Sequence, residues 1–310
     1  MHSFLGELAA LSAAMLWTFA SVLFTSVGKR IGPFNLNAIR ILIGCFLLSL
    51  THYFLLGSFF PSISHMQFLY LSISGIIGLA VGDFAYFGAL IEIGPRRAIL
   101  VSSMAPIFSL IGGFVVLQEF PSPLALIGVF LVFFGVWIVI VEKEESSQIY
   151  GNKIMGVLLG ITAAAGQGIG AVISKYGMLY TGTPLSPLSA SLIRVAVATV
   201  VIWIAILIWK SPRKIISSFK DTYAMKLTIV ASVIGPFLGL WLSMVAINYA
   251  QVGIASTLMS LTPIMIIPVV YFLYGEKINI RGILGAITAV IGVALIFLCL
   301  LYTSPSPRDS

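Results

Sequence analysis

Charged side chains are scarce in this sequence. Aspartate, glutamate, lysine and arginine make up 9% of its 310 residues, whereas a soluble domain carries about 25%. Hydrophobic residues make up 59%, and the mean hydropathy is +1.10. Several apolar runs reach about 20 residues, the length that spans a bilayer as a helix. The composition excludes an ordinary soluble domain and indicates an integral membrane protein, which we expect in a bacterial cytoplasmic membrane.

Other absences narrow the range of functions. The two cysteines, Cys45 and Cys299, lie in apolar runs, so we expect packing residues and no disulfide framework. No cysteines and histidines have the spacing of a zinc site, and no G-x-x-x-x-G-K-[ST] stretch is present for ATP-driven transport. The sequence also lacks a basic domain for nucleic acid. We therefore expect no metal, no cofactor, no nucleic-acid partner and no enzymatic activity.

Ten candidate helices follow one another along the chain. Most connections between them are short, and a polar connection near 142–153 divides the chain almost in half. The sequence predicts an all-α integral membrane protein whose transmembrane helices span residues 6–27, 34–56, 67–90, 96–118, 123–141, 153–176, 187–209, 226–249, 253–274 and 280–301.

The two halves of the chain repeat each other. With a shift of 157 residues, Pro106 aligns with Pro263, and the pair Gly78-x-x-x-Gly82 aligns with Gly235-x-x-x-Gly239. Each copy holds five helices, and an odd number makes the second copy enter the membrane from the opposite side. Inverted repeats of this kind are typical of secondary transporters, which bind their solute near the midplane between the repeats.

The repeat also predicts the domain organisation. We expect a first five-helix repeat at residues 1–145 and a second at 150–301. The tail, 302–310, is polar, rich in proline and serine, and without a counterpart in the first half. We interpret this tail as an artefact of sequencing and not as a part of the fold.

Lysines and arginines gather in alternate loops. The loops after the odd-numbered helices hold nearly all of them, whereas the loops after the even-numbered helices hold at most Lys175. Because positive charge is retained on the cytoplasmic side, this distribution places both termini outside the cytoplasm.

Four segments carry a resemblance to a known family: "AAMLWTFASVLF", "AIRILIG", "GDFAYFGALIEIGPRRAILVSSMAPIF" and "LTPIMIIPVVYFLYGEKI". With them, the chain up to about Leu298 resembles the EamA family of the drug/metabolite transporter superfamily. The resemblance implies a secondary transporter, often an exporter of amino acids or related compounds, with termini in the cytoplasm, opposite to the charge count. Small multidrug members carry an acid in the first helix. Here "AAMLWTFA" has none, which argues against proton-coupled export of cationic drugs.

Asp83 and Arg40 are charges at membrane depth. Asp83 lies about seven residues before the end of the third helix, roughly 10 Å deep, and Arg40 lies at a similar depth in the second. Buried charges are usually paired, so we favour a structural ion pair, while a substrate or proton site and a water-facing position remain open. In the second repeat Arg194 matches Arg40, but Leu240 replaces the acid. Arg194 therefore needs carbonyls, water or an anionic solute as a partner.

Polar and aromatic side chains on helices 1, 3, 6 and 8 outline a candidate cavity, to which helices 4 and 9 would add walls. Such side chains tend to face the interior of a membrane bundle, although helix packing is the alternative for each. An aromatic lining with few charges suits neutral or zwitterionic solutes. The candidate substrate-binding residues are Trp17, Asp83, Tyr86, Gln167, Arg194, Trp241, Ser243 and Asn248.

Helices 4 and 9 carry equivalent prolines and equivalent acids. Pro106 and Pro263 lie inside the predicted helices, where proline removes a backbone hydrogen bond and produces a kink, so we expect these helices to move. Glu119 and Glu276 end the same helices. Their position indicates structural or gating acids and not ligands at the midplane.

The leading hypothesis is a secondary exporter of small metabolites that works by alternating access. Its partners would be a small-molecule solute and the lipid bilayer, coupling to protons or another ion stays open, and we expect a monomer. One alternative is a membrane enzyme or lipid-processing protein, which would need a nucleophile or metal constellation that the sequence does not show. A second is a structural membrane protein without transport activity.

Overall fold

The computed structural model describes residues 4–140, 151–180, 185–209, 215, 218–265, 268–269 and 280–303. No strand occurs within these ranges. Seven helices are long and apolar enough to cross a membrane, and three shorter apolar helices bring the number to ten. The prediction of an all-helical, ten-helix membrane protein is confirmed. Glu276 and residues 304–310 of the tail lie outside the described residues.

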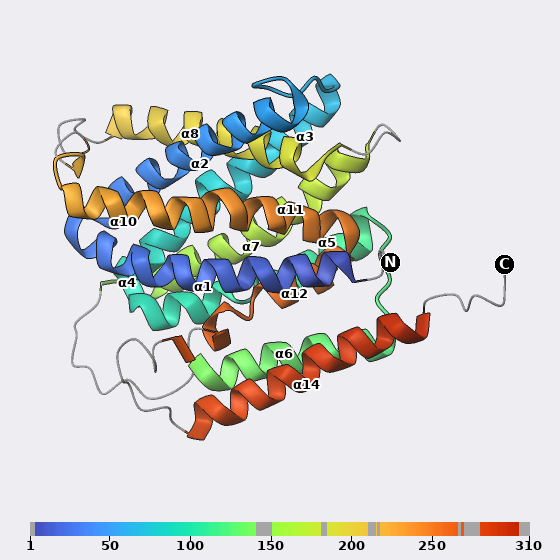
Figure 1. Cartoon of the computed structure of the whole chain (residues 1–310). Helices are drawn as coiled ribbons and strands as arrows, with labels where there is room; N and C mark the ends of the chain where they lie inside the picture. The colour runs from blue at the N-terminus through green and yellow to red at the C-terminus, as the bar shows by residue number, and fades with distance from the viewer. Residues whose placement is uncertain are drawn as a thin grey trace.

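The first half contributes five membrane segments (Figure 1). Its third segment is composite, because a π-helix joins two α-helices. The elements are α1 (Leu5–Ile31), α2 (Pro33–Leu56), α3 (His65–Gly75), η1 (Ile76–Val81), α4 (Gly82–Ser102), α5 (Ala105–Val116) and α6 (Pro123–Ile140).

The second half repeats this order, including the composite third segment. Its described elements are α7 (Lys153–Leu179), α8 (Pro187–Trp209), α10 (Thr222–Ser232), η2 (Val233–Gly239), α11 (Leu240–Tyr249), α12 (Val252–Met259) and α14 (Ile280–Thr303).

Local sequence signals account for several helix ends. Ser64 and Gln67 form a capping box that starts α3, and Gly57 ends α2 with a φ of 74°, a value that glycine adopts without strain. Asp221 caps α10 by accepting the Ala224 N–H. This bond, followed by the bond from Arg30, lowers the pKa of the Asp221 carboxyl.

The chain reverses direction inside α4, although the helical backbone is continuous from Gly82 to Ser102. The neighbours of α7 show the reversal: Gly82 faces Gly166, Ile93 faces Gly156, and Ala105 faces Gly168. Contacts therefore first run down α7 and then return along it. The third and fourth predicted helices are thus antiparallel neighbours, as the sequence indicated.

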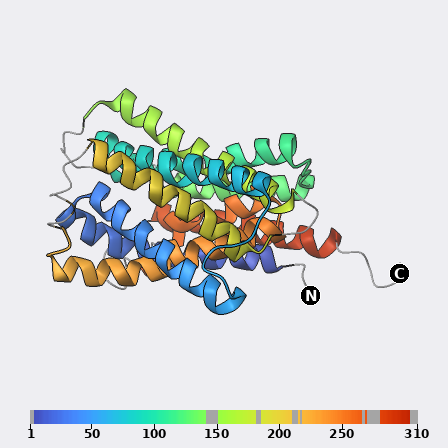
Figure 2. The ribbon, with the colours of Figure 1, turned by 90° about the horizontal axis from the view of Figure 1, so that it is seen from above.

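The two repeats exchange their first helices. In the first half, α1 packs against α10, η2, α11 and α12 of the second half. Reciprocally, α7 of the second half packs against α3, η1, α4 and α5 of the first. The two views show these helices running side by side along one common direction (Figures 1 and 2). Contacts between the repeats, and not within them, therefore build the centre of the bundle.

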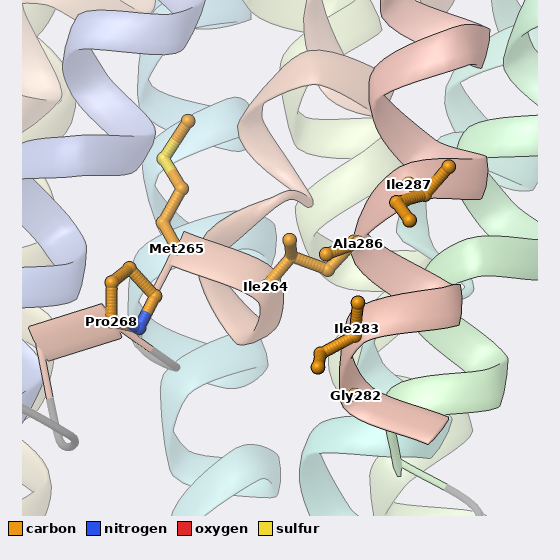
Figure 3. Close-up of a pocket in the computed structure, with 7 residues that line it drawn as sticks. All are labelled: Ile264, Met265, Pro268, Gly282, Ile283, Ala286 and Ile287. Atoms are coloured by element: carbon orange, nitrogen blue, oxygen red, sulfur yellow. The ribbon is translucent and has the colours of Figure 1, made fainter. Parts of the chain in front are cut away.

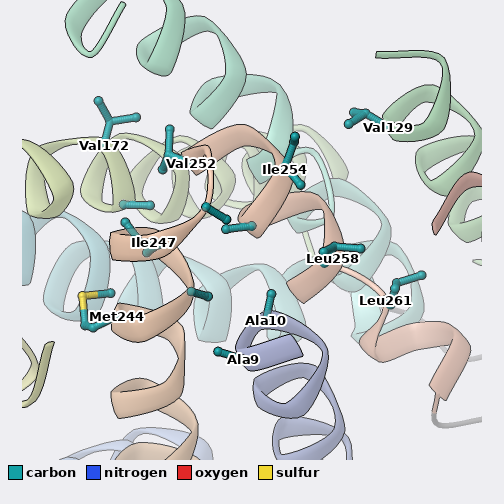
Figure 4. Packing of buried hydrophobic residues seen from close by; sticks show 14 of the residues in the cluster. Ala9, Ala10, Val129, Val172, Met244, Ile247, Val252, Ile254, Leu258 and Leu261 are labelled. Atoms are coloured by element: carbon teal, nitrogen blue, oxygen red, sulfur yellow. The ribbon is translucent and has the colours of Figure 1, made fainter. Parts of the chain in front are cut away.

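A large apolar core lies where α1, α11 and α12 meet α7 and α6. Figure 4 shows its centre, where Ala9 and Ala10 of α1 face Met244, Val252 and Leu258 of the second half. The small alanines let α1 approach closely, as is usual between helices in a membrane.

The outer pair, α6 and α14, lies beside the rest of the bundle and at its edge in Figure 1. Gly128 packs against Gly292, and Gly135 packs against Gly285. Since these contacts run in opposite order along the two helices, α6 and α14 are antiparallel, as equivalent helices of inverted repeats must be.

Equivalent irregularities occur in both halves at the shift of 157 residues. The π-helix Ile76–Val81 matches Val233–Gly239. In addition, α4 ends at Ser102 before α5 starts at Ala105, and α12 ends at Met259 before residues 260–261 turn. π-helical turns are frequent at functional sites. The repeat thus extends from the sequence to the departures from regular helix.

Candidate functional site

The structure brings Asp83 and Arg40 together. Arg40 Nη2 donates to Asp83 Oδ2 at 2.6 Å, and both side chains are largely buried. Gln167 Nε2 donates to the other carboxylate oxygen, Oδ1, at 3.1 Å, and lies 3.2 Å from the Gly78 carbonyl oxygen of η1. Both oxygens of the acid are therefore occupied, one by each repeat.

Neighbouring groups complete the surroundings of Arg40. Its Nε donates to Asn37 Oδ1 at 2.8 Å, one turn earlier in α2. Its guanidinium also lies over the rings of Phe24 and Phe87, 5.4 and 5.7 Å from their centroids. Cation–π contacts of this kind stabilise a charge that has left water. Arg40 is thus paired, hydrogen-bonded and covered by aromatic rings.

Arg194 has a different environment. The residue is 5% exposed, and Gly78 leaves room for its guanidinium, since a Cβ there would lie 3.2 Å from Nη2. Nη1 contacts Met244 Sδ at 3.1 Å, a weak acceptor, and Nε is buried without a hydrogen-bond partner in the described part of the chain. The Arg194 charge interacts with Asp83, but the two groups form no ion pair.

The remaining cavity candidates fall into two groups. Trp17 on α1 lies against Gly239 of η2, and Tyr86 on α4 packs with Ala89 and Ile93. Both are half-buried.

The candidates on α11 do not point to one place. Ser243 is buried and donates to the Leu240 carbonyl of its own helix. Trp241 packs near Phe237 at 6.2 Å between ring centroids. Asn248 is half-buried near the other end of α11, away from Asp83 along the helix repeat. Among the eight candidates, the described contacts join Asp83 and Gln167 directly and place the Arg194 charge beside them.

The prolines sit directly after the helix interruptions. Pro106 occupies the first turn of α5, where no backbone N–H is needed, and α4 has ended at Ser102. Pro263 follows the turn at residues 260–261 in the same way. The interruption is thus a break between two helices and not the kink within a continuous helix that the sequence suggested.

A second charged cluster escaped the sequence reasoning. Lys175 had been grouped with loop charges, but it lies within α7, is 7% exposed, and pairs with Glu119 at 2.5 Å. The available signal was that the fourth and sixth helices end on the same face of the membrane. An acid at one end and a lysine at the other were therefore candidates for a pair.

An apolar pocket lies away from both charged clusters. It is lined by Ile264, Met265 and Pro268 on one side and by the first turns of α14 on the other (Figure 3). Without polar side chains in its lining, this pocket offers no recognition of a polar solute, and its place between outer helices suits a lipid chain.

The arrangement of two exchanged, inverted five-helix repeats around a buried charged site defines a membrane transporter. A family model described as the EamA-like transporter family matches residues 4–141 and 154–298, and the chain belongs to this family. One solved crystal structure is similar over 96% of this chain and 99% of its own, with 16% sequence identity and a TM-score of 0.75. At that identity the likeness shows the fold alone. No curated protein matches the chain.

Proposed function

We propose that this protein is a secondary transporter that exports small zwitterionic metabolites, such as amino acids and related compounds. The observation that carries the proposal is Arg194, a buried guanidinium between the repeats whose Nε has no hydrogen-bond partner in the described part of the chain. A solute carboxylate is the group whose geometry matches a guanidinium fork.

The charge balance around Arg194 supports an anionic group on the solute. Arg40 and Arg194 carry two positive charges, whereas Asp83 supplies one negative charge and is already held by Arg40 and Gln167. One positive charge remains uncompensated. Because an unpaired buried charge is unfavourable, a carboxylate that enters beside Arg194 is stabilised.

Space next to Gln167 supports access for a solute. The residues of α7 that face lipid form a stripe through Leu158, Ile161 and Ile169, all of them exposed. Gln167 lies two residues from Ile169, about 200° around the helix, so it faces the interior of the bundle. Gln167 is nevertheless exposed, which indicates free space inside the bundle beside Asp83.

The helix breaks before Pro106 and Pro263 support alternating access. Each break leaves backbone groups without helical partners inside a membrane segment, which is tolerated where the backbone is buried or lines a water-filled cavity. The segment after each break can change its angle without unwinding a long helix. The two breaks are equivalent, so the repeats can exchange conformations to open the site to one side and then the other.

A transport assay with matched solutes tests the proposal. Purified protein in liposomes is loaded with single amino acids, and exchange is competed by each amino acid and by its carboxamide. We expect the carboxamide to compete about tenfold or more weakly, because it lacks the charge that meets Arg194. Arg194→Met should abolish this discrimination and Arg194→Lys should retain part of it, while Arg30→Met at the exposed pair with Asp221 should retain all of it.

Absence of exchange for every amino acid would contradict the proposed solute class, and equal competition by acids and amides would contradict the role of Arg194. Direction is tested separately with right-side-out and inside-out vesicles. Export predicts uptake into the inside-out vesicles only.

A further inference from the structure

The end of the bundle where α1 begins holds a cluster of two acids and one lysine. Lys175 Nζ donates to Glu119 Oε1 and to the Ala250 carbonyl, both at 2.5 Å. The other oxygen of Glu119 accepts the Val252 N–H at 2.6 Å, in the first turn of α12. Glu119 belongs to the first repeat and the other three residues to the second, so the cluster ties the repeats together at this end.

Glu7 is the second acid of the cluster. It is 3% exposed in the first turn of α1, and its charge interacts with Lys175. The preceding Gly6 packs on the same junction, since a Cβ there would lie 2.6 Å from Ala250 N. Glu7 Oε2 is buried, and no described residue forms a hydrogen bond with it. Lys175 thus serves Glu119 and leaves Glu7 without a full counter-charge.

Two further acceptors near Glu7 have no donor. Asn248 Oδ1 and Gln251 Oε1 are buried without hydrogen-bond partners among the described residues, and they flank Ala250 in sequence. An ionised Glu7 would add one more acceptor and one more negative charge to this site. A protonated Glu7 carries no charge and provides an O–H donor. Protonation therefore corrects both deficits.

The charged groups that face Glu7 come from two elements. Lys175 lies on α7, and Glu119 follows α5; from α11 and its junction with α12 come the neutral Asn248 and Gln251, while Tyr249 is exposed. One ammonium group therefore has two carboxylates within reach of its charge. Which of them it pairs with depends on whether the repeats touch at this end.

We propose that Glu7 is the proton-coupling site of this transporter, an inference that rests on the proposed function. With the repeats in contact, Lys175 pairs with Glu119, and Glu7 carries a proton on Oε2. When the repeats separate, Glu119 withdraws, Lys175 pairs with Glu7, and the O–H bond breaks. The proton is taken from water and returned to water on this side, so its release accompanies opening of the site.

Infrared spectroscopy of the purified protein tests the site without any transport assay. A buried protonated carboxyl gives a C=O stretching band that a carboxylate lacks. We expect this band at neutral pH in the parent protein, its loss in Glu7→Gln, and its retention in Glu92→Gln, where an exposed carboxylate accepts the Asn152 N–H. Because glutamine has the shape of a protonated glutamate, Glu7→Gln should fold. A band unchanged by Glu7→Gln would overturn the proposal.

Exchange in liposomes tests the coupling. Glu7→Gln should keep solute exchange but lose its stimulation by a pH gradient, whereas Glu92→Gln should keep both. Retained stimulation in Glu7→Gln, or stimulation by a sodium gradient in its place, would overturn the proton site. If the parent protein transports nothing while the infrared band behaves as expected, the proposed function fails and the proton-binding site stands.

Discussion

At the scale of single residues, the two equivalent arginines differ in one neighbour. Arg40 lies over the ring of Phe87, and Arg194 contacts the sulfur of Met244, which occupies the matching position 157 residues later. The difference is the acid, since Asp83 is replaced by Leu240 in the second repeat. The acid therefore neutralises one arginine and leaves the other available for a solute.

A double-mutant cycle tests the pair at residue scale. Asp83→Asn and Arg40→Leu should each lower the free energy of unfolding by about 3–5 kcal/mol, because each strands a buried charge. The double variant should recover much of the loss. Thermal unfolding in detergent measures the three variants and the parent. Additive losses in the double variant would show that the two groups do not stabilise each other.

At the scale of elements, glycines decide where helices approach. At Gly135, an added Cβ would lie 2.5 Å from the Gly285 carbonyl oxygen, and at Gly128 it would lie 2.7 Å from that of Gly292. These contacts are between backbones, so no side chain can move to relieve a clash. The symmetric pair of contacts holds α6 against α14.

A substitution at this contact should therefore separate the outer helices. Gly135→Leu should destabilise the protein by about 1–3 kcal/mol, the usual cost of overpacking, because the side chain must force α6 and α14 apart. Ile127→Ala, on the exposed face of α6, serves as the control and should change the melting temperature little. Equal melting temperatures for Gly135→Leu and the parent would contradict the close packing.

At the scale of the whole molecule, basic residues predict the orientation. The exposed Lys220 lies between α8 and α10, at one end of the bundle, and the exposed Gln118 follows α5, at the end where the chain begins. Lys175, the one basic residue that had counted against the asymmetry, is buried in an ion pair. The charge distribution thus predicts that Lys220 faces the cytoplasm.

Labelling in intact cells measures this orientation. In a variant without Cys45 and Cys299, an impermeant thiol reagent should label Gln118→Cys from outside and should label Lys220→Cys only after permeabilisation. The reverse pattern would place both termini in the cytoplasm.

Helix number, helix type and the duplication were predictable because hydrophobic length and composition are local properties of the chain. The pairing of Asp83 with Arg40 was also within reach, since depth along two neighbouring helices follows from residue number. The Gln167 bond to Asp83 was not, because it depends on how deeply α7 enters the opposite repeat.

The sequence by itself determined that ten apolar helices must lie in a membrane as two related halves of opposite direction, because charge scarcity and an odd repeat leave no other arrangement. Only the tertiary structure decided which helices exchange between the halves, and therefore which charges meet. Lys175 and Glu119 are 56 residues apart and on different repeats, and no periodicity links them. Their contact exists because small side chains let α7 pack into the first repeat, and packing of that kind is a property of shape in three dimensions.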